Sequence, residues 1–499
     1  MVVSRYLTVT NYSKVDVDAL ALLAFKGEDP SKVFSDVNEY LGGLLSRVVE
    51  LGDFKGELKE SEVVVLYSSK DEGPKRVILV GGGELSKADY EVLRVYGGTA
   101  VSKARSLGVK KLAIALRVIN NNPLKSLKAV AEGAELANYV FSKYKKDVKL
   151  VDEVFIVGKE SIEGSNEVLK EVSILGEAYR LARDLANTPP EDANPDTLEG
   201  IIKEVFKDIP NTEVKVLNEE QLKKEGLNGI IAVGKGSVRR PRLVIIEYRG
   251  GGSKWYALVG KGVCFDSGGI NLKRSKWIVD MKYDKAGAMA VLATTYAVAK
   301  LKLPINLVAL LPLVENMPSG SAIKPGDIIR MYNGLTVEIV TTDAEGRLIL
   351  ADAIAYAVKN YKPEFVIDLA TLTGSIVVAL GNQAAGLFSN DESLTKLIEE
   401  AANESGERVW RMPLWREYFE DIKSEVADIK NLGYEGTAGA QAGAAFLAKF
   451  TEGTKWAHLD IASTAWTQDE GPKKPYYPKG ATGYGIRLLV ELLKKLPKA

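Results

Sequence analysis

At 499 residues, the chain is longer than a single compact core usually requires, and its length predicts about two domains. Hydrophobic residues make up 46% and charged residues 26% of the sequence, which excludes a disordered or fibrous chain. The 66 basic and 66 acidic residues cancel, so the molecule has no long-range field to attract nucleic acid or an anionic membrane, and we expect neither as a partner.

The sequence contains one histidine, His458, and one cysteine, Cys264. A single chain of this kind cannot form a histidine-based zinc site, a Ser-His-Asp triad or an internal disulfide. Catalysis must then use carboxylates, amines, guanidinium or metals bound by oxygen. The opening MVVSRYLTVT lacks the features of a signal peptide, and no apolar run reaches the roughly 18 residues of a membrane span. We therefore expect a cytoplasmic protein.

Residues 1–165 alternate short apolar runs with charged, helix-like stretches, which predicts a non-catalytic N-terminal α/β domain. The apolar runs are Leu20–Phe25, Val63–Tyr67, Val77–Val80, Leu112–Leu116 and Val154–Val157. A helical pattern over Glu167–Ala186 then meets Pro189 and Pro190, which must end it. We interpret residues 166–187 as a linker helix and residues 188–499 as a second domain.

The second domain repeats strand, loop and helix, which predicts an α/β/α architecture with a mixed, largely parallel central sheet. The expected strands are Leu243–Tyr248, Trp255–Val259, Ile305–Leu311, Val337–Thr341, Phe365–Leu369 and Ala457–Ile461. In open α/β sheets, ligands bind at the carboxyl ends of the strands. The residues that follow these strands are therefore the candidates for function.

The first candidate segment is VGKGVCFDSGGINLK, in which Lys261 and Asp266 are expected on a glycine-rich loop after the strand Trp255–Val259. Glycines at Gly268 and Gly269 permit a close approach of the backbone to a ligand. Taken alone, the segment also has an explanation without a function, in which Lys261 is a solvated lysine and Asp266 only forms a turn.

The second candidate segment, DMKYDKAGAM, places two aspartates just before a helix of small residues. Asp280 and Asp284 are four residues apart, so both carboxylates can face one way if the helix begins early. Either could be a ligand. The alternative is that both merely stabilise the positive end of the helix dipole.

The third candidate segment follows the expected strand Val337–Thr341 and contains Asp343, Glu345 and Arg347 before a helix predicted over Leu348–Tyr361. Charged side chains beside a core are costly unless they are paired or functional. A salt-bridged structural cluster remains the alternative. The next strand ends in a polar turn of small residues, Thr371-Leu372-Thr373-Gly374.

Together these strand ends bring the carboxylates of Asp266, Asp284, Asp343 and Glu345 toward Lys261, Lys273 and Arg347. Four negative charges in one site repel unless cations neutralise them, and two divalent ions balance the count. Such a pair can bridge and ionise a water, and the free cations can stabilise developing negative charge. The pattern predicts two-metal hydrolytic chemistry, and a phosphoesterase is one class of enzyme that uses such carboxylate pairs.

These segments resemble the leucyl aminopeptidase (cytosol aminopeptidase) family. The resemblance rests on VGKGVCFDSGGINLK and TTDAEGRLILADA, and extends through ENMPSGSAIKPGD, DLATLTGS, RVWRMPLW, AGAQAGAAFL, WAHLDIA and GATGYGIRLL. It covers the chain from about Ala178 to the C-terminus.

The resemblance implies specific roles for the residues of the site. It makes Lys261, Asp266, Asp284, Asp343 and Glu345 the metal ligands, which favours Asp284 over Asp280, and makes Lys273 and Arg347 the catalytic pair. It also implies a bicarbonate ion at the arginine as general base. The implied substrate-binding residues are Lys273, Met281, Thr371, Leu372, Gly374 and Ala462.

The resemblance further implies two ions of zinc or manganese, with magnesium or cobalt as candidates at an exchangeable position. It implies a macro-like N-terminal domain, a homohexamer, and substrates with a free N-terminal amine and leucine or a similar apolar first residue. Some members also bind DNA as regulators, a role that the zero net charge disfavours here. Two departures from the family pattern, Lys285 and Thr341, bear on metal affinity and on side-chain preference.

Overall fold

The computed structural model describes residues 3–58, 63–434, 436–467 and 473–496. It divides into two compact units, one of Met1–Glu177 with Lys473–Pro478 and the other of Ala178–Pro472 with Lys479–Ala499. The division falls within the long helix α6 (Ser165–Asn187). No helix in the described part of the chain is long and apolar enough to cross a membrane.

The first unit is built on a six-stranded sheet in the order β1-β6-β5-β2-β4-β3. All neighbours in this sheet are parallel except the edge strand β3, which runs antiparallel to β4. Its strands are β1 (Val3–Thr8), β2 (Ala19–Ala24), β3 (Val63–Tyr67), β4 (Arg76–Gly81), β5 (Lys111–Ala115) and β6 (Glu153–Gly158). The central strand β2 is buried along its whole length, which is why its sequence is uniformly apolar.

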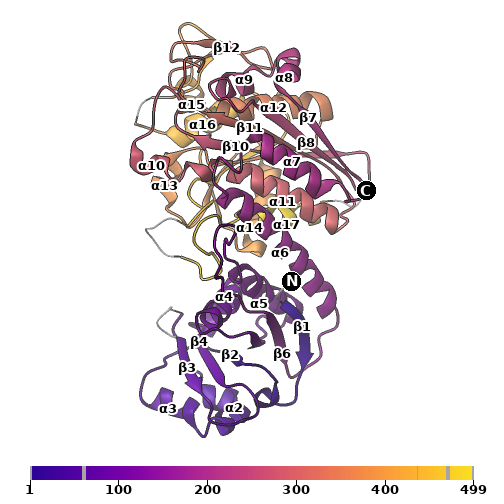
Figure 1. Ribbon diagram of the computed structural model, residues 1–499, viewed down its shortest axis with the longest axis vertical. Coiled ribbons are helices and arrows are strands. Elements are labelled where there is room, and N and C mark those ends of the chain that lie inside the picture. Colours follow the sequence, from indigo (N-terminus) through magenta and orange to yellow (C-terminus); the bar gives the residue numbers. More distant parts are fainter. Residues whose placement is uncertain (1–2, 59–62, 435, 468–472, 497–499) are drawn as a thin grey trace. The chain divides into compact units, whose positions relative to one another are not determined.

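Helices cover both faces of this sheet (Figure 1). One face carries α4 (Tyr90–Ser106) and α5 (Pro123–Ala137), which pack against each other. The other face carries the short helices α1 (Pro30–Val33), α2 (Ser35–Tyr40) and α3 (Leu44–Glu50). Apolar side chains of these short helices and their flanks, including Phe34 and Leu45, share one buried cluster with β2 and β4. The predicted α/β character of this region is confirmed.

The second unit contains a nine-stranded mixed sheet in the order β16-β15-β18-β14-β9-β11-β8-β7, with β10 also paired to β11. The pairs that β9 makes with β11 and β14 are parallel, as are those of β14 with β18 and of β10 with β11. The strands are β7 (Thr212–Leu217), β8 (Arg242–Arg249), β9 (Trp255–Gly260), β10 (Gly262–Asp266), β11 (Asn306–Asn316), β14 (Val366–Ala370), β15 (Ala385–Ser389), β16 (Val409–Arg411) and β18 (Trp456–Asp460). The sheet is mixed and largely parallel at its centre, as the sequence predicts.

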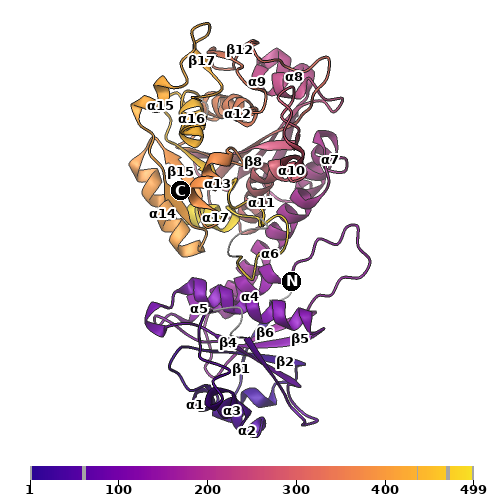
Figure 2. The ribbon, with the colours of Figure 1, turned by 90° about the vertical axis from the view of Figure 1, so that its left-hand side faces the viewer.

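Helices also cover both faces of the larger sheet (Figure 2). One face carries α8 (Glu219–Glu225), α9 (Asn228–Gly234), α12 (Gly346–Tyr361) and α16 (Gly439–Ala448). The other carries α7 (Pro195–Phe206), α11 (Ala286–Lys300), α14 (Glu392–Ser405) and α17 (Ile486–Lys494). Short helices α10 (Ser275–Ile278), α13 (Gly374–Leu380) and α15 (Arg416–Glu420) complete the unit.

One strand prediction and one loop prediction are wrong in a way that matters for the site. The expected strand Val337–Thr341 is only β13 (Thr336–Glu338), which belongs to a separate three-stranded sheet with β12 (Ile328–Arg330) and β17 (Ile429–Lys430). Asp266, expected on a glycine loop, is the last residue of the strand β10. Most of the apolar residues of both segments are buried, but burial alone does not distinguish a strand of the main sheet from a packed irregular segment.

Candidate metal centre

The centre of the larger sheet is interrupted at Lys261, which lies between β9 and β10. The long strand β11 pairs with β9 along its first half and with β10 along its second half. Lys261 remains tied to the sheet because its N–H donates to the carbonyl of Leu369 at 2.9 Å. The sheet therefore continues past Lys261, whose side chain contacts the carboxylates described below.

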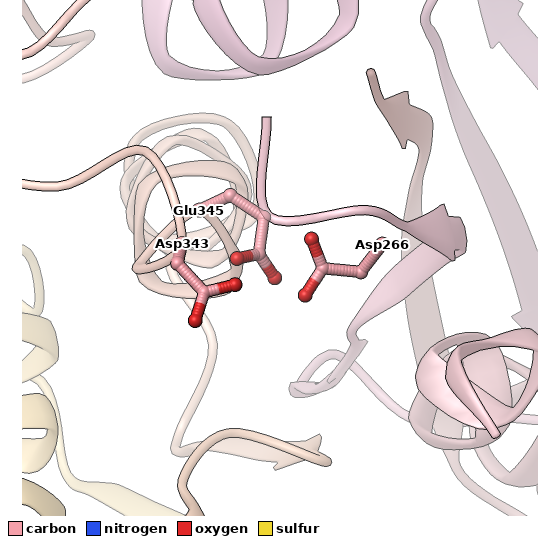
Figure 3. Close-up of side chains that lie close together, drawn as sticks. All are labelled: Asp266, Asp343 and Glu345. Atoms are coloured by element: carbon pink, nitrogen blue, oxygen red, sulfur yellow. The ribbon is translucent and has the colours of Figure 1, made fainter. Parts of the chain in front are cut away.

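Three carboxylates converge in front of this break (Figure 3). Asp266, Asp343 and Glu345 each offer one oxygen, and these three oxygens lie within 4.8 Å of one another. The side chains of Asp266 and Glu345 are almost fully buried, whereas that of Asp343 is 41% exposed. A set of this spacing and chemistry is suited to a divalent cation with oxygen ligands.

Asp284 approaches from another direction, on the short 3-10 helix Met281–Lys285 that precedes α11. Its Oδ1 accepts hydrogen bonds from Lys261 Nζ at 2.8 Å and from the Thr371 hydroxyl at 2.7 Å. Its Oδ2 is buried and has no hydrogen-bond partner among the described residues. Asp280, the alternative considered from the sequence, is exposed. Asp284 therefore has a buried oxygen available for a ligand, and Asp280 does not.

Two lysines bridge the carboxylates in pairs. Lys261 Nζ lies 2.8 Å from Asp284 Oδ1 and 2.9 Å from Glu345 Oε1. Lys273 Nζ lies 2.8 Å from Asp266 Oδ2 and 2.6 Å from Asp343 Oδ1. The cluster thus contains four carboxylates and two ammonium groups, so two negative charges remain unbalanced when all four carboxylates are ionised.

The acid–base properties of the cluster reflect this excess of negative charge. Burial, reinforced by Glu345, raises the pKa of Asp266 to about 6, although Lys273 opposes the change. Burial also raises the pKa of Asp284 well above its ordinary value, against the opposing effect of Lys261. Burial by itself lowers the pKa of Lys261, but Asp284 and Glu345 outweigh it and raise that pKa. A bound cation would stabilise the ionised forms of Asp266 and Asp284 and the neutral form of Lys261.

Arg347 lies at the start of α12 and is 5% exposed. Its Nε and Nη1 are buried and have no hydrogen-bond partner among the described residues. Burial lowers the pKa of Arg347 to about 10, while Glu345 and Asp460 oppose that change. The guanidinium therefore presents unused donors close to the carboxylate cluster, which suits it to an anion or to developing negative charge.

Three polar residues that the sequence analysis did not assign to the site hold the ligand loops together. Asn316 Nδ2 donates to Asp266 Oδ1 at 2.8 Å and to the Thr342 carbonyl at 3.0 Å. The Thr342 hydroxyl donates to the Gly268 carbonyl at 2.6 Å, and the Thr342 N–H donates to Asn271 Oδ1 at 2.9 Å. The loop after Asp266 and the loop before Glu345 are thereby joined. Asn316 lies within the resembling string ENMPSGSAIKPGD, which was the only sequence signal for it.

The Lys261 side chain leaves no room for a side chain at position 346, where the chain has glycine. A Cβ at position 346 would lie 2.4 Å from Lys261 Cε and 2.8 Å from Lys261 Nζ. We expect Gly346→Ala to displace Lys261, to destabilise the second unit by about 1–3 kcal/mol, and to lower kcat/KM more than about tenfold. Thermal unfolding and initial rates measure the two effects.

Gly200→Ala is the matched control, because Gly200 lies in the helix α7 and a Cβ there meets nothing within 4 Å. This control should be neutral or slightly stabilising, since alanine is the better helix former. Full activity of Gly346→Ala would mean that Lys261 need not occupy its observed position.

A cavity of about 800 Å³ opens onto the cluster. Its lining contains every one of the predicted substrate-binding residues, which are Lys273, Met281, Thr371, Leu372, Gly374 and Ala462. It also contains all five predicted metal ligands, whereas Arg347 lies outside the described lining residues. Trp466 lines this cavity as well and stacks on Tyr283 with ring centroids 5.6 Å apart.

The two departures from the family pattern have local explanations. Lys285 is fully buried, and its ammonium donates to the carbonyls of Thr188 at 3.1 Å and Lys282 at 2.5 Å. Its burial lowers the pKa of Lys285 to about 8. Thr341 is not among the described residues that line the cavity, and its hydroxyl accepts the N–H of Asp343 at 3.3 Å.

The single histidine is buried and bonded to a neighbouring strand. His458 Nδ1 lies 2.6 Å from Asp368 Oδ1, which joins two adjacent strands, β18 and β14. Cys264 is fully buried, and burial raises the pKa of its thiol above the ordinary range. Neither residue lines the cavity within the described part of the chain.

Comparison with known protein families gives two matches that together span most of the chain. Residues 180–490 match the model of the cytosol aminopeptidase family, catalytic domain. Residues 21–148 match the model of the cytosol aminopeptidase family, N-terminal domain.

Individual relatives agree with these matches. A probable cytosol aminopeptidase of Geotalea uraniireducens is 44% identical over 474 residues, which are 93% of this chain and 94% of the relative. One of Cenarchaeum symbiosum is 44% identical and covers 84% of this chain and 86% of the relative.

Solved structures are similar over nearly the whole chain. A mutant of tomato leucine aminopeptidase has a TM-score of 0.88 and 32% identity, covering 99% of this chain and 97% of that protein. The bottromycin maturation enzyme BotP in complex with Mn has a TM-score of 0.83 and 32% identity, covering 96% of this chain and 99% of that protein.

Proposed function

The chain belongs to the cytosol aminopeptidase family and is a metal-dependent aminopeptidase, and we propose that its metal ligands are Lys261, Asp266, Asp284, Asp343 and Glu345. The observation that carries this proposal is the excess of two negative charges in a largely buried cluster, together with the unpartnered Oδ2 of Asp284 among the described residues. Buried carboxylates without compensation are costly, and two dications would remove the cost. The family membership favours peptide hydrolysis over the phosphoesterase alternative.

The donor set favours metals that accept oxygen ligands together with one amine. Manganese or zinc fits this set, with magnesium or cobalt as candidates at the more exposed position beside Asp343. The similar enzyme BotP has been solved in complex with Mn, which supports manganese as the first ion to test. When bound, two divalent ions would polarise the scissile carbonyl and lower the pKa of a water molecule.

The chain's own cations would then act on the reacting carbonyl. Lys273, whose ammonium is held between Asp266 and Asp343, is placed to stabilise negative charge that develops on the carbonyl oxygen. Arg347, whose buried Nε and Nη1 have no acceptor among the described residues, is suited to hold a bicarbonate ion that would act as general base. These two residues form the proposed catalytic pair.

The cavity would bind the first residue of a peptide through its apolar and polar lining. Met281, Leu372 and Ala462 offer apolar surface for a leucine-like side chain. Thr371 and Gly374 lie at the carboxyl end of β14, where they border the same space. We propose leucine or a similar apolar residue as the preferred N-terminal residue.

The family resemblance also supports proposals about the assembled protein. We propose a cytoplasmic homohexamer that acts on peptides with a free N-terminal amine. The balance of 66 basic and 66 acidic residues supports neither DNA nor a membrane as a partner.

The testing experiment is the release of p-nitroaniline from Leu-p-nitroanilide by the full-length protein. After chelation, activity should be lost, and it should return on addition of manganese or zinc. Size-exclusion chromatography of the same sample reports whether the protein is folded and hexameric. A folded hexamer without activity in any divalent metal would overturn the proposal.

A further inference from the structure

Among the described residues that line the 800 Å³ cavity, all the charged ones except one are members of the ion-paired cluster. That exception is Arg274, which directly follows Lys273. Among the described residues, no carboxylate pairs with its guanidinium and no acceptor is found for it. The cavity therefore contains an exposed cation that the metal centre does not use.

Exposed apolar side chains line the same cavity as Arg274. Trp277 is 58% exposed and Leu272 is 62% exposed, and both lie within a few residues of Arg274. Val378, on α13, is 89% exposed and lines the same cavity. Large apolar surfaces on a cavity wall are typical of binding sites that a ligand covers. A cavity lined by an arginine, an indole and aliphatic side chains offers both charge recognition and apolar contact.

The spacing along the chain limits how far this region lies from the metal centre. Consecutive Cα atoms are about 3.8 Å apart, and an extended peptide advances about 3.3–3.6 Å per residue. Lys273 reaches the carboxylates Asp266 and Asp343, and Arg274 is the next residue, with an extended backbone. Arg274 lines the same cavity as the metal cluster, so a short peptide that begins at the cluster can extend toward it.

We propose that Arg274 binds the C-terminal carboxylate of a di- or tripeptide whose first residue occupies the metal centre. Trp277 and Leu272 would cover the apolar side chain that follows the scissile bond. The proposal deepens the proposed aminopeptidase function and rests on it. It makes short peptides with a free carboxylate, rather than the ends of long chains, the favoured substrates. Arginine suits this role because its guanidinium can bind a carboxylate in a bidentate manner.

The test compares acids and amides of the same peptides. For wild type, kcat/KM is measured with Leu-Phe, Leu-Ala-Phe and their C-terminal amides. Amidation at one of these lengths should lower kcat/KM about fivefold, mainly through KM, because a partly exposed arginine–carboxylate pair is worth up to about this factor. The difference should shrink at high ionic strength. In Arg274→Gln, acid and amide should be hydrolysed equally.

Arg416→Gln is the control, because Arg416 is 90% exposed on α15 and is not a lining residue in the described chain. This variant should keep the wild-type ratio of acid to amide. The Leu-p-nitroanilide rate, which involves no C-terminal carboxylate, shows separately whether the metal centre is assembled and whether the proposed function holds.

Two results would overturn the proposal for Arg274. One is equal hydrolysis of acid and amide by wild type at both lengths, and the other is discrimination that survives in Arg274→Gln. Peptide amides with glutamate at the second or third position can be compared with the amides that lack it. If only the glutamate-containing amides are hydrolysed faster, Arg274 would instead be assigned to binding an acidic side chain. That outcome would also contradict binding of the C-terminal carboxylate.

Discussion

Asp284→Asn is expected to lower kcat/KM by more than about a hundredfold, since even the outer partners of metal ligands cost about 10–100-fold when they are removed. The same change should not destabilise the metal-free protein. Burial already raises the pKa of Asp284 well above its ordinary value, so at neutral pH its negative charge is a cost to the fold. Asparagine keeps the shape and removes that charge.

The distinguishing measurement is the thermal unfolding temperature with and without manganese or zinc. Wild type should gain stability on metal addition, because an ion that binds only the folded state stabilises it. Asp284→Asn should lose most of this gain while its metal-free unfolding temperature stays equal or higher. If the cluster were only a structural set of salt bridges, the variant would instead unfold earlier without metal.

Asp280→Asn provides the matched control for this experiment. Asp280 precedes Asp284 by four residues on the same segment, but its side chain is exposed. It should keep both activity and the metal-induced stabilisation. Loss of both properties in Asp280→Asn would mean that the ligand has been assigned to the wrong aspartate.

Lys273→Gln is expected to lower kcat by about 10²–10³-fold with a smaller change in KM, which is the effect of removing one group that stabilises the transition state. The metal-free variant should also be less stable, because Asp266 and Asp343 both lose their ion pair at 2.8 and 2.6 Å. Addition of metal should restore most of that stability, since dications neutralise the same carboxylates. Steady-state kinetics and thermal unfolding with metal measure the two effects.

Lys276→Gln removes the same charge three residues further along, from an exposed side chain that does not line the described cavity. It should retain wild-type kcat. Failure of Lys273→Gln to bind metal at all would contradict the proposed separation of roles between Lys273 and the proposed ligand Lys261.

The composition of the site could be predicted from the sequence because charge is expensive in a buried place. Asp343, Glu345 and Lys261 stand beside apolar segments where unpaired charge has few structural explanations, and the structure brings all three together. The main sheet was also predictable, since continuous apolar runs such as the one in β2 are characteristic of buried parallel strands. Family resemblance was still needed to choose between Asp280 and Asp284.

The local backbone of the site was not predictable in the same way. Val337 and Ile339 are fully buried, so the segment resembles a core strand, yet its pairing ends at Glu338. Pairing partners are set by tertiary contacts that periodicity does not encode. The same holds for Asn316 and Thr342, whose importance depends on hydrogen bonds to residues 26 to 74 positions away.

The bonds among Thr342, Asn271, Gly268 and Asn316 have a consequence for any redesign of this enzyme. They join the two loops that carry proposed metal ligands, so a change in the conformation of one loop would break hydrogen bonds to the other. A chimera that takes only one of these loops from a relative would lack some of the hydrogen bonds that join the two loops. Substrate preference should therefore be transplanted by exchanging both loops together, and laboratory evolution should accept changes in them as pairs.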